Sequence, residues 1–174
     1  MKNGDNADDF FLEPEPIDPK KLFNEEEYST LIVNREGFDK KQNDTADLIE
    51  SLFEKKLTRQ EFEQIIEGLK KANAQNMLVD AIEGTNNVHE QTVLAQAAWE
   101  SGLDFSTHFM FFVSLACSSD AMLSLEALTV IESTETKIES DVLMKAISIA
   151  SNSTNINSMV KEDLLINLQS RLES

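Results

Sequence analysis

Apolar residues recur at intervals of three and four along the chain from Thr45 onward, which is the spacing of one face of a helix. The first two stripes are Leu48, Ile49, Leu52 and Phe53, then Phe62, Ile65, Ile66 and Leu69. Thr58 and Glu61 have the spacing of a capping box before the second stripe. These patterns predict two amphipathic helices in antiparallel contact, and no convincing pair of strands is found elsewhere.

The segment from Gln91 to Ser151 is apolar on more than one side, so the pattern predicts three consecutive helices at the centre of the fold. The densest of them, Phe105 to Cys117, keeps only a narrow polar wedge. Gly84 and Gly102 predict helix ends before and within this region. An amphipathic helix over Ile138 to Ala150 is expected next, and a final helix is expected to cover the end of the fold.

A faint internal repeat relates these helices. Val79, Val113 and Ile147 are spaced by 34 residues, as are Ile82, Ala116 and Ala150. A shorter spacing of 33 and 32 residues relates Ile66-Glu67, Trp99-Glu100 and Ile131-Glu132. Periods of this length are typical of stacked helical hairpins, in which no single unit can bury its apolar face alone. An irregular helical bundle with coincidental matches is the alternative.

The residues from Val88 to Ser151 resemble HEAT-like helical repeats, through the stretches LAQAAWESGL, FMFFVSLACSSD and LSLEALTVIES. The resemblance implies short helix pairs, with small residues inside the first helix, that stack into a right-handed solenoid serving as a protein-binding scaffold. It implies no enzymatic activity. The expected fold is therefore all-α, a short HEAT-like α-α superhelix of stacked antiparallel helix hairpins.

Acidic residues are spread through the whole chain. There are 32 Asp and Glu against 15 Lys and Arg, a formal net charge of −17. Residues 44–174 contribute 21 acids and 9 bases, and no Lys or Arg lies between Lys71 and Lys137. Residues 1–43 are acidic and contain all three prolines, which predicts a largely disordered arm with a short helix. A helical-repeat domain is expected over residues 44–174.

This composition argues against several classes of partner and site. Duplex nucleic acid and anionic membrane surfaces bind basic footprints, which the chain lacks. No stretch has the length of a membrane span or a signal peptide, and one cysteine, Cys117, excludes an internal disulfide framework. No glycine-rich phosphate motif, CxxC or HExxH is present. We therefore expect a cytoplasmic, non-enzymatic protein without a cofactor or metal.

Asp104 and His108 are the one candidate chemical pair, since they lie four residues apart on one helical face. A carboxylate and an imidazole at this spacing can serve as an acid–base pair or as two metal ligands, as in a hydrolase or metal-dependent enzyme. A buried histidine that is satisfied by its helix-capping aspartate explains the same residues, and this is the role we expect.

Phenylalanine and methionine side chains gather in and after the densest helix, at Phe109, Met110, Phe111, Phe112 and Met122. Such side chains can form adaptable walls, so a carrier of an apolar ligand in a core cavity is an alternative function. At helical spacing the same residues also make an ordinary core.

The repeat places glutamates at matching positions, so that stacking aligns them as a ladder of carboxylates. The expected partner-binding acids are Glu67, Asp80, Glu83, Glu100 and Glu132. Phe10 and Phe11 in the arm are a second candidate for docking to a partner. We therefore expect a protein–protein interaction module or adaptor whose acidic surface receives a basic partner. A face that is merely solvated is the alternative, and the oligomeric state is left open.

Overall fold

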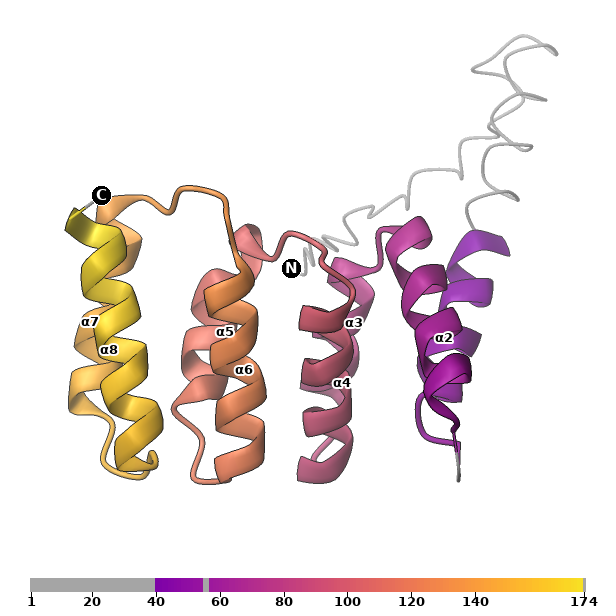
Figure 1. The fold of residues 1–174 in the computed structure, drawn as a ribbon, viewed down its shortest axis with the longest axis horizontal. Helices are drawn as coiled ribbons and strands as arrows, with labels where there is room; N and C mark the ends of the chain where they lie inside the picture. The colour runs from indigo at the N-terminus through magenta and orange to yellow at the C-terminus, as the bar shows by residue number, and fades with distance from the viewer. Residues whose placement is uncertain (1–39, 55–56, 174) are drawn as a thin grey trace, which may run out of the picture. The chain divides into compact units, whose positions relative to one another are not determined.

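The computed structural model describes residues 40–54 and 57–173, and every regular element in these ranges is helical (Figure 1). Residues 40–51 form the first described helix. The next elements are α2 (Arg59–Ala72), α3 (Gln75–Gly84), α4 (Val88–Glu100), the 3-10 turn η2 (Ser106–His108), α5 (Phe109–Ala116), α6 (Ala121–Ser133), α7 (Ser140–Asn152) and α8 (Ser158–Glu173). The predicted all-α class is confirmed. Phe10 and Phe11 lie outside the described residues.

Helix ends follow the capping residues of the sequence. The Thr58 side chain accepts a hydrogen bond from the Glu61 backbone N–H at 3.3 Å, and the Glu61 carboxylate accepts one from the Thr58 backbone N–H at 2.8 Å. This is the capping box predicted at the start of α2. Asp120 caps α6 through two backbone N–H groups of its first turn. Gly102 follows α4 with φ of +59°, a conformation that strains other residues.

The helix predicted over Phe105 to Cys117 begins with a different local geometry. Ser106–His108 form the 3-10 turn η2, and α5 starts only at Phe109. The Asp104 carboxylate accepts a hydrogen bond from the Ser106 backbone N–H at 2.9 Å, which satisfies a donor that the helix leaves unpaired. The apolar pattern in the sequence predicted the position of this helix, whereas the hydrogen bond from Ser106 to Asp104 determines the geometry of its first turn.

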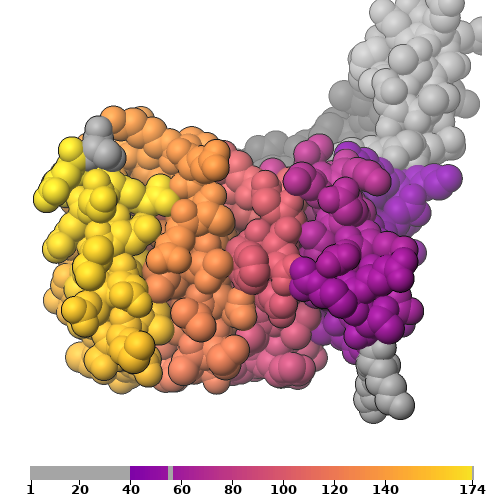
Figure 2. Space-filling model, in the orientation of Figure 1, coloured from indigo at the N-terminus to yellow at the C-terminus, as the bar shows by residue number. Residues whose placement is uncertain are grey.

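From α3 onward the helices form pairs in chain order, α3 with α4, α5 with α6 and α7 with α8. We call α4, α6 and α8 the even layer and α3, α5 and α7 the odd layer. In Figure 1 the even layer lies in front of the odd layer. Helix α6 packs against both α4 and α8, and α5 packs against α7. In Figure 2 the pairs follow one another as neighbouring bands. Each pair therefore shares its apolar side with the next.

Most of the residues that the 34-residue spacing aligned are buried, and Ile147 is partly buried. Ile82, Ala116 and Ala150 are all nearly inaccessible to solvent, and Val79 and Val113 are buried as well. These residues lie 34 positions apart in α3, α5 and α7. The interval of 34 residues is thus the distance along the chain from one odd-layer helix to the next.

Phe112 lies in the middle of the apolar seam between the layers. It is 1% exposed, and its ring makes edge-to-face contacts with Phe105 and Phe111 at centroid distances of 5.2 Å. Leu128 of α6 is 2% exposed in the same core. The expectation that Phe112 and Leu128 share one buried seam is confirmed.

Phe112→Ala is expected to lower the free energy of unfolding by about 3–5 kcal/mol, because loss of the ring leaves a cavity that its neighbours fill only in part. The measurement is equilibrium unfolding in guanidinium chloride. Leu125→Ala is the matched control, since Leu125 is 47% exposed on α6. This substitution is expected to change the free energy of unfolding by no more than about 0.5 kcal/mol. Equal losses in the two variants would show that Phe112 is not central to the core.

Candidate functional site

The outward side of α6 and α8 is the candidate site, and we call it the α6–α8 outer face. Its residues share exposure to solvent and a spacing of three or four along each helix. They are Met122, Leu125 and Glu132 on α6, and Met159, Glu162, Asp163 and Ile166 on α8. The apolar members are between 47% and 73% exposed. The all-round apolar pattern of α6 did not predict that two of its large apolar residues face solvent.

Basic side chains of α8 are directed to helix ends. Lys161 Nζ donates to the carbonyl oxygens of Ser151 and Ser153 at 2.8 and 2.7 Å, at the end of α7. Arg171 Nη2 donates to the carbonyl oxygen of Ile131 at 2.8 Å, near the end of α6. Carbonyl groups at a helix C-terminus carry partial negative charge, so both cations stabilise these ends. Helix α6 itself contains no Lys or Arg.

Arg59 of α2 holds Glu100 of α4. Two guanidinium nitrogens donate to the two carboxylate oxygens at 3.1 and 2.9 Å, a bidentate pair. Gln96 donates a further bond at 3.0 Å, and the Glu100 side chain is only 10% exposed. Burial acts to raise the pKa of Glu100, but the bonds from Arg59 and Gln96 together outweigh it and leave the pKa below its ordinary value. Glu100 therefore joins two helices within the molecule.

The expected spacing aligned Trp99 with Ile66 and Ile131. Both isoleucines are buried, and so is Ala98, the residue before Trp99. This alignment rested on the large apolar residue that precedes a glutamate at each of the three places. Trp99 is instead half-buried, and its indole N–H donates to the Glu126 carboxylate on α6 at 2.5 Å. Trp99 thus links α4 to α6.

The acids expected to bind a partner are distributed over both layers. Glu67 on α2 and Glu132 on α6 are exposed. Asp80 and Glu83 are exposed on α3, in the odd layer. The Glu100 side chain is mostly buried and is bound by Arg59. The structure therefore does not gather the five acids into one ladder, and their role in binding stays a prediction.

Asp104 and His108 have separate partners. Asp104 accepts hydrogen bonds from the Thr136 hydroxyl at 2.7 Å and the Ser106 backbone N–H, and these bonds lower its pKa. His108 Nε2 lies 2.7 Å from the side-chain oxygen of Asn76 on α3, and His108 is half-buried. The expected contact between Asp104 and His108 is wrong. Each residue instead connects segments about one repeat apart, at the amino-terminal ends of the odd-layer helices.

The five residues proposed as a cavity lining divide between core and surface. Phe109 and Phe112 are 2% and 1% exposed, whereas Met110 and Phe111 are half-buried. Met122 is 57% exposed and belongs to the α6–α8 outer face. The cluster is thus mostly part of the packed seam, and its methionine on α6 faces outward.

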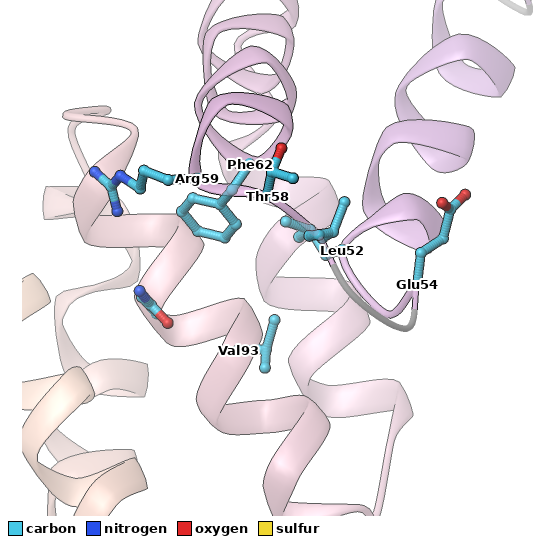
Figure 3. Close-up of a pocket in the computed structure, with 8 residues that line it drawn as sticks. Leu52, Glu54, Thr58, Arg59, Phe62 and Val93 are labelled. Atoms are coloured by element: carbon cyan, nitrogen blue, oxygen red, sulfur yellow. The ribbon is translucent and has the colours of Figure 1, made fainter.

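A pocket of about 330 Å³ lies where the segment before α2, α2 itself and α4 meet (Figure 3). Leu52, Leu57, Phe62 and Val93 provide its apolar walls. The Arg59 guanidinium lies over the Phe62 ring, 5.7 Å from its centroid. Sequence reasoning did not identify this pocket, because its walls come from three separate segments and only Leu52 and Phe62 among its apolar residues belonged to predicted stripes.

No protein-family model matches this chain, and comparisons with curated proteins and with solved structures find no match either. Within the residues that the structure describes, no helix combines the length and hydrophobicity needed to cross a membrane. In the same residues, no three His, Cys, Asp or Glu side chains lie close enough together to hold a metal ion. The arrangement of the side chains is therefore the basis for proposing a function.

The Arg59–Glu100 pair predicts a pH-dependent cost for Glu100→Gln. A carboxylate whose pKa is lowered in the folded state stabilises it above the pKa of the unfolded state, and this contribution is lost as pH falls through the folded value. The variant is expected to be less stable by on the order of 1 kcal/mol near neutral pH, because Arg59 is largely exposed. The difference from wild type should shrink between about pH 5 and pH 3.

Urea unfolding at a series of pH values measures this difference, with Glu67→Gln as the control. Glu67 is exposed on the neighbouring helix α2. Its replacement should change stability by less than about 0.5 kcal/mol. A cost for Glu100→Gln that is independent of pH would contradict a role for the ionised carboxylate.

Proposed function

We propose that the helical body of this chain is a non-catalytic protein–protein interaction module, a short HEAT-like stack whose acidic surface receives a basic partner. The observation that carries the proposal is the position of three of its cations, within a body that has 21 acids against 9 bases. Arg59, Lys161 and Arg171 bind a carboxylate or helix-end carbonyl groups of the molecule itself. Carboxylates such as Glu67 and Glu132 remain exposed. Negative charge that is not neutralised in this way attracts a basic partner and orients its approach.

The HEAT-like part of the proposal is supported by how the helix pairs pack. Helix α6 packs against α4 and α8 of the neighbouring pairs, α5 packs against α7, and buried positions recur at intervals of 32 to 34 residues. Ala95, Ala97 and Ala98 in α4 are fully buried small residues, although α4 is the second helix of its pair and the resemblance implies small residues in the first. In such stacks the solvent-facing side of one layer becomes an extended binding surface. We propose in the same way that the stack forms a right-handed superhelix.

Joint replacement of Glu67 and Glu132 by Gln tests the proposal. The double variant should capture a basic partner about three- to tenfold less well, because two exposed charge contacts of modest strength are removed. The decrease should be smaller at raised salt, where these charges are already screened. Quantitative mass spectrometry after affinity purification from the native cell, at two salt concentrations, provides the measurement.

Gln64→Ala on α2 with Gln169→Ala on α8 is the matched control, since both residues are exposed and uncharged. A chain that lacks residues 1–43 shows whether Phe10 and Phe11 contribute to the same partner. Glu100 is left intact, so that the link between α2 and α4 is preserved. Capture that is unchanged in the Glu67/Glu132 variant at both salt concentrations would refute the proposed acidic binding surface.

A further inference from the structure

We propose that the α6–α8 outer face binds a basic amphipathic helix of another protein. This inference rests on the proposed function and names the place and kind of partner. The face combines large exposed apolar side chains with carboxylates on two neighbouring helices. Neither feature alone would define the ligand, but together they match a helix with one apolar side and flanking Lys or Arg.

The apolar part of the face is formed by flexible side chains. Met122 and Met159 are 57% and 73% exposed and lie 37 residues apart, the interval that also separates the buried residues Ala127 and Leu164. They therefore occupy equivalent positions on the outward sides of α6 and α8. Ile166 is 57% exposed two turns further along α8. Unbranched methionines adapt to differently shaped partners, so this surface suits the side chains of a docked helix.

The charged part of the face is acidic, although Arg171 of α8 also interacts electrostatically with Glu132. Glu132, Glu162 and Asp163 are exposed beside the apolar side chains. The two basic residues of α8, Lys161 and Arg171, donate to main-chain carbonyl oxygens at the ends of α7 and α6. Charge complementarity therefore selects a basic partner.

The dimensions of the face suit a helix. Helix α6 has 13 residues and α8 has 16, which corresponds to lengths of about 20 and 24 Å at the usual rise of 1.5 Å per residue. A partner helix of about four turns would span this length and place side chains at positions i, i+3, i+4 and i+7 on the exposed apolar residues. Anionic lipid and nucleic acid are disfavoured by the same carboxylates.

The test uses the full chain and a fluorescent synthetic peptide of about 18 leucine and lysine residues, arranged to form an amphipathic helix. Fluorescence anisotropy measures its binding. Met122→Ala with Met159→Ala is expected to weaken binding at least about tenfold, as truncation of central apolar contacts does in other interfaces. Glu162→Gln with Asp163→Asn is expected to weaken binding at low salt and to reduce its salt dependence.

Each double variant has a matched control in the odd layer. Met144→Ala removes a methionine that is 53% exposed on α7, and Asp80→Asn with Glu83→Gln neutralises two exposed acids on α3. Both controls should change the affinity by less than about twofold. A peptide of the same composition without an apolar side should bind at least about tenfold more weakly than the amphipathic one.

Three results would overturn the inference. The first is no binding of the amphipathic peptide to the folded wild-type chain. The second is equal weakening by the even-layer and odd-layer acid variants with no effect of the methionines, which indicates general charge attraction. The third is equal binding of the two peptides. The last two results would leave the proposed acidic interaction module intact. If the amphipathic peptide does not bind, the capture experiment with the Glu67 and Glu132 variant still tests that module separately.

Discussion

Burial of apolar side chains between successive helix pairs is the interaction on which the described structure depends. Phe112 of α5 and Leu128 of α6 are almost completely removed from solvent, and each such side chain contributes about 1.5–3 kcal/mol when buried. The small residues Ala97 and Ala98 allow close approach at the same seam. Because every pair covers the next, each helix turns one side inward, and only its outward side is available for binding.

Three of the basic residues, Arg59, Lys161 and Arg171, have structural roles. Lys161 and Arg171 bind carbonyl groups at the ends of α7 and α6, where the helix dipoles favour positive charge. Arg59 neutralises Glu100, which is largely buried. Arg59 also binds the exposed Glu63 at 2.8 Å, so its charge is shared between a buried and an exposed carboxylate. The acidity of the surface follows mainly from the excess of acids, which number 21 against 9 bases in residues 44–174.

The hydrophobic pattern predicted the helices, the capping box at Thr58 and the equivalence of Ile82, Ala116 and Ala150, because these features are local or strictly periodic. It did not predict the partners of Asp104 and His108. Those partners lie 32 residues away, at Thr136 and Asn76, and only packing brings the segments together. Nor could it show which side of an all-round apolar helix stays open, because this depends on where the neighbouring helices lie.

Exposed methionines on an acidic face have a consequence for specificity. An apolar patch on a protein surface favours self-association, and Met122, Met159 and Ile166 would provide one. Two copies that met through this face would bring Glu162 and Asp163 of each copy close to like charges, which is unfavourable. The same carboxylates favour a basic helix at that place. The charges around the patch thus select against a second copy of this chain and in favour of a partner of opposite charge, so attraction and repulsion both contribute to recognition.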